Sequence, residues 1–351
     1  MKQKNSNQNR TGMRGIGTLL LMVLAVLTTG IIPAVLADTP EETMERLPEL
    51  VLVGPPGPMA IPLAYLAENN KLADIADRTR LVVWENSDQL RSIAIGGSDA
   101  HFLTMPSHSA ATFYNKGADL KLLDISVWGI IYVISTDPAI SSIDDLKGEE
   151  IVISMQGEMP DVLFNYICQK NGIDTAKDLS IYYANTPQQA ASLILSGEKK
   201  HAVLTEPLIT QVIMKGKSSN LDISRVIDLQ VEWSYASGLG ERVPIAGTVA
   251  LPAIKDNPVI IKRFMEEYAD AVKWLVENPE LAGELGSQVE KLGFEAKPIA
   301  ESTRNIRWDF VPVTECRDEI ESFFSALNEL NPKIIGDKLP DDGYYYKGTQ
   351  Q

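Results

Sequence analysis

Residues 50–67 read LVLVGPPGPMAIPLAYLA, and this stretch sets the pattern that decides the fold. The apolar run Leu50–Gly54 is followed by a loop rich in proline and glycine, and the segment from Pro58 to Asn70 has the spacing of an amphipathic helix. Proline suits the first position of a helix because the N–H that it lacks would have no partner there. The stretch therefore predicts a buried strand, a short loop and a helix in direct succession.

The same succession recurs along the chain. Further apolar runs, mostly continuous as in strands covered on both faces, lie at Arg80–Glu85, Ala100–Met105, Lys121–Ser126, Ile130–Ser135, Glu150–Met155, Leu179–Ala184, His201–Thr205 and Val243–Leu251. Helical patterns lie at Pro106–Lys116, Asp161–Asn171, Pro187–Gly197, Pro258–Glu277, Pro279–Leu292 and Glu315–Leu330. Strand–helix–strand repetition predicts crossover units and parallel sheets.

The order of these elements predicts an α/β protein with two lobes, each a mostly parallel sheet flanked by helices. Lobe 1 is expected over residues 45–135 plus 246–351, and lobe 2 over residues 136–245. The chain then crosses between the lobes twice, near Ser135–Pro138 and at Val243–Leu251. Two crossings form a hinge about which the lobes close on a ligand.

The first 37 residues have the features of a secretory signal. Four basic residues precede an uncharged run, residues 15–37, whose end Ala34-Val35-Leu36-Ala37 has small residues where a signal peptidase reads them. A run of about 20 uncharged residues is also long enough for a retained membrane anchor, but Pro33 and the preceding Thr-Thr-Gly interrupt it. We expect cleavage after about Ala37 and a periplasmic protein, without a lipid anchor because no cysteine follows the run.

The charge of the mature chain limits its partners. The sequence has 32 basic and 47 acidic residues, and loss of the signal removes four basic ones, which leaves a net charge of −19. This balance argues against nucleic acid and anionic membrane surfaces as partners, and a monomer is expected. The only cysteines are Cys168 and Cys316. Cys168 lies on the apolar stripe of a predicted helix, which favours two free thiols over a disulfide.

The proline loops supply the candidate ligand-binding residues. Open α/β sheets place their ligand crevice at the carboxyl ends of parallel strands, and each helix start there offers free N–H groups. Prolines begin helices in any α/β protein, yet four of the five loops, all but that at Pro187, are also polar or rich in glycine. They contribute Pro56, Gly57, Met59, Thr104, Met105, Ser107, His108, Gln156, Gly157, Glu158, Met159, Asp161, Thr205 and Glu206.

Two aromatic residues complete this candidate set. Trp128 lies near the first predicted crossing, and Trp233 lies in a segment that leads back to the hinge. Either indole could stack on a bound molecule, although ordinary packing is the more frequent role of a single aromatic side chain.

Several stretches together resemble a known family. The sequence is similar to the substrate-binding proteins of ABC importers in the NMT1/taurine/sulfonate-like group, in the order and spacing of residues 54–67 (GPPGPMAIPLAYLA), 104–117 (TMPSHSAATFYNKG), 141–148 (SSIDDLKG), 186–197 (TPQQAASLILSG), 202–207 (AVLTEP) and 339–346 (LPDDGYYY). The resemblance implies the type II periplasmic binding fold, an ABC permease as partner, and a cleft lined by the strand-to-helix loops of both lobes. The family's ligands include alkylsulfonates, nitrate, thiamine-precursor pyrimidines and aromatic acids.

The loops give conflicting signals about the ligand. Helix starts favour an anion or a hydrogen-bond acceptor, whereas Glu158, Asp161 and Glu206 stand at the same helix starts. These carboxylates either compensate the helix dipole or pair with a cationic or N–H-rich ligand. No arginine occupies the four loops, which weakens a tightly held sulfonate or phosphate. A neutral or heterocyclic ligand is therefore favoured.

The sequence offers little for catalysis. Its three histidines, His101, His108 and His201, have no metal-ligand spacing, and no nucleophile elbow or phosphate-binding loop is present. The cysteine-rich motif of the related yeast-type pyrimidine synthases is also missing. We expect no enzyme activity, no metal and no cofactor. The alternatives are a binding module for a sensor or a non-ABC transporter, and a pyrimidine-synthase-like enzyme.

Overall fold

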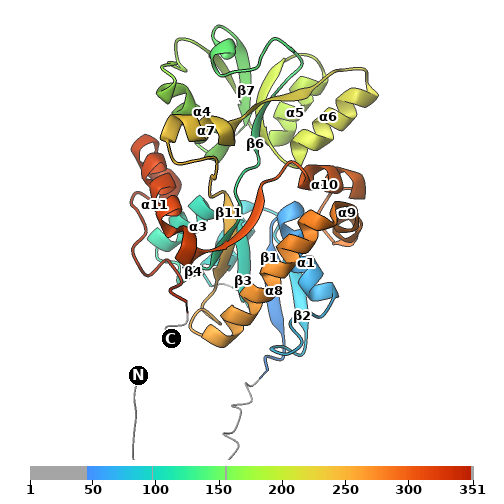
Figure 1. The fold of residues 1–351 in the computed structure, drawn as a ribbon, viewed down its shortest axis with the longest axis vertical. Coiled ribbons are helices and arrows are strands. Elements are labelled where there is room, and N and C mark those ends of the chain that lie inside the picture. The colour runs from blue at the N-terminus through green and yellow to red at the C-terminus, as the bar shows by residue number, and fades with distance from the viewer. Residues whose placement is uncertain (1–45, 97, 155, 349–351) are drawn as a thin grey trace, which may run out of the picture. The chain divides into compact units, whose positions relative to one another are not determined.

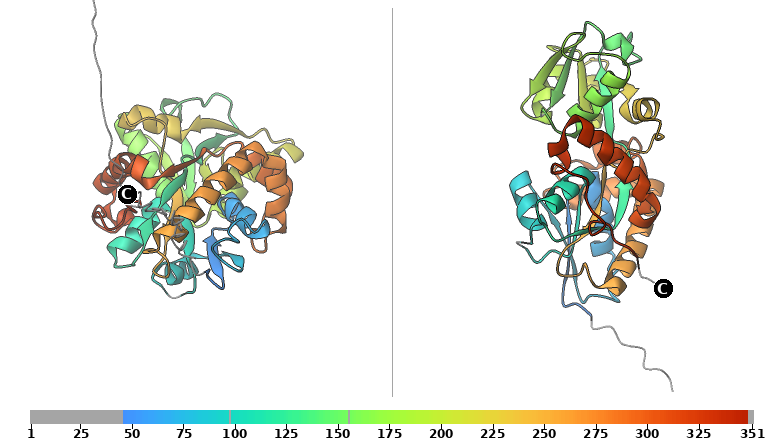
Figure 2. Two further views of the ribbon diagram at one scale, coloured as in Figure 1. Left: turned by 60° about the horizontal axis from the view of Figure 1, so that its bottom comes forward. Right: turned by 90° about the vertical axis from the view of Figure 1, so that its left-hand side faces the viewer.

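The computed structural model describes residues 46–96, 98–154 and 156–348, so the predicted signal and its cleavage site lie outside the described residues. Two mixed sheets form the framework, with helices on both faces of each (Figures 1 and 2). The first has the order β12-β5-β11-β3-β1-β2, with β4 paired to β11, and the second has the order β10-β6-β9-β7-β8.

The strands of the first sheet are β1 (Leu50–Gly54), β2 (Thr79–Val83), β3 (Phe102–Pro106), β4 (Lys121–Leu122), β5 (Asp124–Val127), β11 (Ala246–Ala250) and β12 (Trp308–Pro312). Those of the second are β6 (Ile131–Ser135), β7 (Glu150–Ser154), β8 (Ser180–Ala184), β9 (His201–Thr205) and β10 (Ser224–Asp228).

The helices are α1 (Ile61–Glu68), α2 (Ser87–Ala94), α3 (Ser107–Asn115), α4 (Met159–Lys170), α5 (Pro187–Leu195), α6 (Leu208–Ser218), α7 (Leu229–Ser237), α8 (Pro258–Glu277), α9 (Pro279–Gln288), α10 (Ala296–Thr303) and α11 (Val313–Leu330). Short 3-10 turns are η1 (Pro58–Ala60), η2 (Asp144–Leu146) and η3 (Pro332–Ile335). Within the described residues, no helix is long and apolar enough to cross a membrane.

The continuous apolar run of β1 is buried on both faces, as the sequence predicts. Leu50 and Leu52 belong to the core formed with α1 and α8, whereas Val51 and Val53 belong to the core on the opposite face. Successive side chains of a strand point to opposite faces, so a strand covered on both sides needs an apolar residue at every position.

The two-lobed α/β architecture is confirmed, but the sheets are mixed rather than mostly parallel. Parallel pairing is confined to β2-β1-β3 in the first sheet and β8-β7-β9 in the second. The strands that carry the chain from one sheet to the other, β5, β6 and β11, pair antiparallel with their neighbours. β6 and β11 enter their sheet from the other lobe and not through a crossover helix, and β5 leads out of its sheet toward the other lobe. The direction of these strands is therefore not restricted to parallel.

The first crossing between the sheets lies at Trp128–Ile130. The sequence division assigns residues 131–135 to lobe 1, yet β6 pairs with β9 and β10 in the second sheet. An apolar run shows that a strand is buried, but not to which sheet it belongs. The second crossing, residues 238–245, leads into β11, which begins at Ala246.

The five prolines stand close to helix starts but not all at the first position. Pro58 and Pro187 are first residues, Pro160 is the second residue of α4, and Pro106 and Pro207 directly precede α3 and α6. Each helix therefore begins within one residue of its proline, because the ring fixes a backbone angle that a helix start accepts.

A side-chain clamp holds the first crossing. The Oε1 atom of Gln230 accepts hydrogen bonds from the N–H groups of Ile130 and Ile131, at 3.1 and 3.0 Å. Its Nε2 donates to the carbonyl oxygen of Ile131 at 3.0 Å and to Asp228 at 2.6 Å. Gln230 is fully buried, and its amide pairs with the start of β6 as a neighbouring strand would.

Gly129 lets this clamp come close to the chain. A Cβ atom at position 129 would lie 2.4 Å from Cγ of Gln230 and 3.1 Å from Cδ of Arg307. Contacts below 3 Å force a displacement in a packed interior, so glycine is needed here for space.

Replacement of Gln230 by methionine tests the clamp. The variant keeps the side-chain volume but leaves two backbone N–H groups and one carbonyl without partners, and each such buried group costs about 1–3 kcal/mol. We expect the free energy of unfolding to fall by at least about 2 kcal/mol in urea denaturation. The exposed Gln188→Met is the control and should change it by less than about 0.5 kcal/mol. Equal effects of the two variants would contradict the clamp.

A buried carboxyl group lies in the core of lobe 1. Asp124 is fully buried, and neither carboxylate oxygen has a hydrogen-bond partner within the described residues, although the hydroxyls of Thr248 and Ser126 lie beside it. Burial raises the pKa of Asp124 to about 8, and the backbone and hydroxyl of Thr248 and the hydroxyl of Ser126 offset only part of that effect. Asp124 is therefore protonated in the folded protein at neutral pH.

This pKa makes stability depend on pH. Because the pKa in the folded state lies above the ordinary value of 3.8, the folded state binds more protons than the unfolded state between these values. The free energy of unfolding should therefore fall as the pH rises from about 5 to 8, by at most about 1.4 kcal/mol per pH unit. Asp124→Asn should flatten this slope in denaturation series, whereas the exposed Asp222→Asn should leave it unchanged. An unchanged slope in the first variant would refute the assignment.

Candidate functional site

The carboxyl ends of the parallel strands supply the loops of the candidate site. In the first sheet these strands end at Gly54, Val83 and Pro106, and in the second at Ser154, Ala184 and Thr205. Open α/β sheets bind ligands at the carboxyl ends of their parallel strands.

Loops of the two lobes lie close to each other. A Cβ atom built on Gly57, in the loop after β1, would lie 3.9 Å from Cδ of Pro207, which follows β9. A Cβ atom on Gly157, in the loop after β7, would lie 3.9 Å from Nδ2 of Asn331, which follows α11 of the first lobe. The loop after β1 therefore faces lobe 2, and the loop after β7 faces lobe 1.

The loop after β1 is shaped by its glycine. Gly57 has a φ of +142°, which side-chain-bearing residues rarely adopt. Pro56 is exposed and Met59 is half-buried against the core. The backbone forms a tight turn at Gly57, and the ring of Pro56 is open to solvent. The 3-10 turn η1 begins directly after Gly57, at Pro58.

The residues around β3 divide into core and site. Thr104 and Met105 are fully buried within the strand, and the hydroxyl of Thr104 lies 3.1 Å from that of Thr248 on β11. The Ser107 hydroxyl donates to the carbonyl oxygen of Pro244 in the second crossing. Ser107 therefore links α3 to the hinge, and its hydroxyl proton is already used.

His108 keeps an unused ring nitrogen. Its Nε2 lies 3.3 Å from the Ser109 hydroxyl, whereas its buried Nδ1 has no hydrogen-bond partner within the described residues. Burial lowers the pKa of His108 to about 4, so the imidazole is neutral at pH 7. A buried polar atom without a partner costs free energy, and a bound molecule that reached it would remove that cost.

The loop after β7 has an internal support. Asp161 accepts hydrogen bonds from the Gly157 N–H at 2.8 Å, the Asn165 amide at 2.7 Å and the Tyr183 hydroxyl at 3.0 Å. Gln156 and Glu158 are exposed on the same loop, and Met159 is buried. Asp161 thus holds the loop in place and leaves Gln156 and Glu158 to face outward.

Glu206 is likewise committed to the protein. Its carboxylate accepts from Nε of Arg225 at 2.8 Å and from the N–H and hydroxyl of Thr210 at 3.1 and 2.8 Å. Burial raises the pKa of Glu206, and Arg225 and Thr210 partly oppose that rise. Thr205, one residue earlier, is half-buried and completes β9.

The two tryptophans of the predicted set are both 1% exposed. Trp128 donates from its indole nitrogen to the carbonyl oxygen of Asp309 at 2.7 Å, and the Arg242 guanidinium lies 3.8 Å from its ring centroid. Trp233 packs between Tyr166 of lobe 2 and Phe323 of α11, at 5.0 and 5.4 Å between centroids. Trp233 therefore packs across the two lobes, and Trp128 joins the two crossings to β12 of lobe 1.

Sequence reasoning missed Trp84. The backbone N–H of Trp84 donates to the carbonyl oxygen of Gly54 at 3.1 Å. This hydrogen bond places Trp84 beside the start of the Gly54–Pro58 loop. Its buried indole nitrogen has no partner within the described residues. The signal was present, because the apolar run Arg80–Glu85 is also a strand that ends at this edge, but no proline marks the loop.

Arg307 ties the two crossings together. Its guanidinium donates to Asp228 at 2.9 Å and to Glu241 at 2.7 Å, and its backbone exchanges hydrogen bonds with Trp128 and Gly129 at 2.8 and 2.9 Å. No sequence signal identified it, because Asp228 lies 79 residues away. The arginines nearest the hinge therefore have anionic partners of their own.

Arg307→Gln tests how much these interactions of Arg307 stabilise the two crossings. The substitution leaves the half-buried Asp228 without its cation, and we expect the free energy of unfolding to fall by about 1–2 kcal/mol. Hydrogen exchange should accelerate at residues 228–243. Arg304→Gln removes exposed pairs with Glu280 and Glu301 and should cost less than about 0.5 kcal/mol. Identical exchange patterns in the two variants would rule out a hinge role.

Metal-ligating side chains and cysteines are the remaining groups of the described residues that could take part in chemistry. No group of three or more His, Cys, Asp or Glu residues is arranged to hold a metal ion within the described residues. Cys168 and Cys316 are buried free thiols, which confirms the prediction of no disulfide between them.

A serine, a histidine and a glutamate do meet, in lobe 2. The Ser135 hydroxyl lies 2.9 Å from Nδ1 of His201, whose Nε2 lies 3.5 Å from Glu149. Ser135 and His201 are each 1% exposed, and the serine hydroxyl also contacts Asp137. A substrate has no access to such a hydroxyl, so the contact stabilises the end of the sheet.

Solved structures with a similar fold include proteins described as parts of ABC transporters. An ABC transporter protein from Parabacteroides distasonis has a TM-score of 0.69 at 21% identity, with 86% of this chain and 100% of that chain covered. The aliphatic sulphonate binding protein SsuA of Escherichia coli has 0.67 at 15%, with 87% and 94% covered. The nitrate-binding protein NrtA of Synechocystis PCC 6803 has 0.55 at 14%, with 83% and 82% covered.

These likenesses confirm, at the level of the fold, the resemblance to two-lobed periplasmic binding proteins. No protein-family model matches the sequence, and no curated protein matches it.

Proposed function

We propose that this chain is the periplasmic substrate-binding component of an ABC-type importer and that it holds a small molecule between its lobes. The observation that carries the proposal is the closeness of strand-end loops from two sheets, which the described part of the chain joins by two crossings. A Cβ atom built on Gly57 would lie 3.9 Å from Pro207. The sulphonate- and nitrate-binding proteins of the same fold support the same role.

Binding would work through hinge closure. A ligand that touches both lobes stabilises the closed conformation by its differential affinity for that conformation. Gln230 and Arg307 hold the crossings in a defined geometry, so the loops move as parts of two rigid bodies. The unused polar atoms at the loops, such as Nδ1 of His108, then meet the ligand only when both lobes surround it.

A neutral or heterocyclic ligand fits this site best. His108 is uncharged at neutral pH, because burial lowers its pKa. Arg225 and Arg307 are paired with Glu206 and Asp228, so neither is available to a sulfonate without loss of an existing ion pair. Nδ1 of His108 in the first turn of α3 and the indole nitrogen of Trp84 just after β2 have no partner within the described residues, and both are hydrogen-bonding groups of a neutral site.

Native mass spectrometry of the mature protein, purified without refolding, tests the proposal. We expect a co-purified small molecule whose mass identifies it. In thermal-shift assays its addition should raise the melting temperature in proportion to the logarithm of its excess. Absence of any bound mass, together with a flat response to neutral heterocycles, sulfonates and nitrate, would contradict a solute-binding role.

Gln156→Ala tests the site itself. Gln156 is exposed on the loop after β7, and loss of one hydrogen bond to a ligand should weaken binding about tenfold. Its matched control is Gln188→Ala, an exposed glutamine in the first turn of α5, which follows the loop that the candidate site excludes. Isothermal titration should show the change only for Gln156, with equal melting temperatures of the unliganded variants. A tenfold loss in both would move the site elsewhere.

A further inference from the structure

The two lobes meet on two sides that are packed differently. On one side, Trp233 of α7 has its ring centroid 5.0 Å from that of Tyr166 on α4 and 5.4 Å from that of Phe323 on α11 (Figure 1). We call these three rings the aromatic joint. They belong to a core cluster that contains both Leu103 of β3 and Ile153 of β7, so this core is continuous between the lobes. Separation on this side would expose shared apolar surface to water, which costs free energy in proportion to its area.

On the other side, α10 of lobe 1 lies against α6 of lobe 2 (Figure 1). Ile299 of α10 belongs to a core cluster of lobe 1 together with Ile61, whereas Ile209 of α6 belongs to a separate core cluster of lobe 2. Two of the strand-end loops stand on this side, because η1, which follows Gly57, lies against α10, and Pro207 directly precedes α6. The lobes can therefore part on the α10 side with both cores intact.

A hydrogen bond joins the lobes next to α10. The hydroxyl of Tyr132, on β6 of lobe 2, donates to the carbonyl oxygen of Asn305, just after α10 of lobe 1, at 2.7 Å. Tyr132 is 9% exposed. Burial raises the pKa of Tyr132 to about 12, so the phenol keeps the proton that it donates at neutral pH. Parting of the lobes on the α10 side breaks this bond.

Tyr132 also contacts the ion pair that supports the loop after β9. The guanidinium carbon of Arg225 lies 5.8 Å from the centroid of the Tyr132 ring, within the range of a cation–π contact. Nε of Arg225 donates to Glu206 at 2.8 Å, and Glu206 directly precedes Pro207. A chain of contacts therefore runs from Asn305 of lobe 1 through Tyr132 to the candidate site in lobe 2.

We propose that the lobes open on the α10 side alone, with the aromatic joint as the pivot, and that Tyr132 is the positioning residue that holds the α10 side shut. This inference rests on the proposed function, because it names the side from which the site between the lobes is entered. A small molecule enters beside Gly57 and Pro207, and closure remakes the hydrogen bond between Tyr132 and Asn305. The aromatic joint stays packed throughout, as expected for a hinge that moves two rigid bodies.

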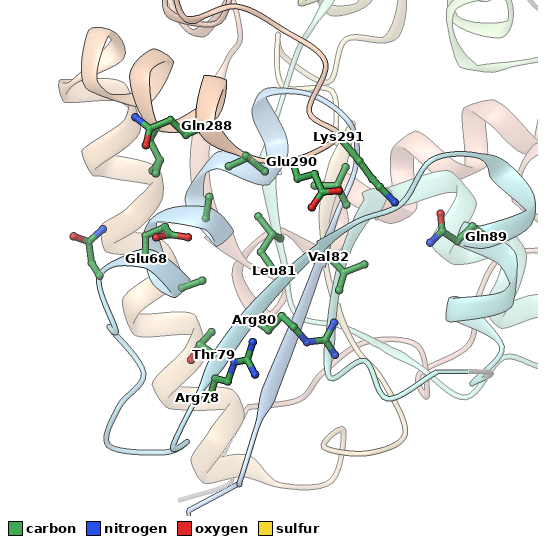
Figure 3. A pocket seen from close by; sticks show the side chains of 16 residues that line it. Glu68, Arg78, Thr79, Arg80, Leu81, Val82, Gln89, Gln288, Glu290 and Lys291 are labelled. Atoms are coloured by element: carbon green, nitrogen blue, oxygen red, sulfur yellow. The ribbon is translucent and has the colours of Figure 1, made fainter.

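The distance across a groove within lobe 1 distinguishes this motion from a movement of α9 and α10 alone. The groove has a volume of about 840 Å³ and lies between β2 and the end of α9 (Figure 3). Arg78, just before β2, and Gln288, the last residue of α9, line opposite walls. If the whole lobe rotates, the distance between these two residues stays constant. It changes if α9 and α10 move as a lid.

Pulsed electron paramagnetic resonance on the mature protein without added solute tests the proposal, with spin labels on pairs of introduced cysteines. The native cysteines are buried free thiols, so the labels attach to the introduced ones. The three pairs of exposed positions replaced by cysteine are Glu301 with Lys215 across the α10 side, Gln169 with Glu329 across the α11 side, and Arg78 with Gln288 across the groove.

Tyr132→Phe should change only the pair across the α10 side. Since the variant loses one hydrogen bond between the lobes, the ratio of short to long distances in that pair should fall about fivefold. The other two pairs should keep the distances of the wild type. Tyr235→Phe is the matched control, because the Tyr235 side chain is 77% exposed on α7, and it should change no pair. Melting temperatures of the two variants establish that both fold.

Three outcomes would overturn the proposal. Equal widening of the pairs across the α10 and α11 sides would rule out the aromatic joint as the pivot. An unchanged α10-side pair in Tyr132→Phe would rule out the role of Tyr132, and a changed distance across the groove would show that α9 and α10 move alone. Each of these leaves the proposed transport role standing, because the co-purified mass tests that role independently.

Discussion

The geometry of this protein depends on the buried amide of Gln230. The chain passes between the sheets as an extended segment, and an extended backbone leaves its N–H and C=O groups unsatisfied unless another strand lies beside it. At the start of β6 that neighbour is a side chain, which accepts two N–H groups and donates to one carbonyl. Gly129 and Arg307 complete the arrangement, one by giving space and the other by fixing the second crossing.

Most polar groups of the predicted site already have partners within the protein. Asp161 supports a loop, Glu206 balances Arg225, and Ser107 donates to the hinge. The geometry of the site is thus held by groups that a ligand does not need to touch. His108 and Trp84 are different, because each keeps a buried nitrogen with no partner among the described residues. This division separates the residues that position the site from those suited to contact a guest.

Strand and helix positions followed from the sequence because their signals are local. The bounds of β1, β9 and α8 agree with the apolar runs and helical patterns residue for residue. Strand direction and membership of a sheet did not follow, as β6 shows. In the site, the loops could be found from strand ends and prolines, but the pairing of Glu206 with Arg225 could not, because nothing near Glu206 in the sequence marks its partner.

The sequence by itself determined the α/β class, the repeated strand–loop–helix unit and the loops that gather at the sheet edges. Each of these depends on the hydrophobic periodicity of neighbouring residues, which is a local property of the sequence. Only the tertiary structure decided where the chain crosses between sheets and which carboxylates are paired. Those outcomes depend on contacts between residues about 20 to 100 positions apart, such as Gln230 with Ile130, and the topology alone brings such residues together.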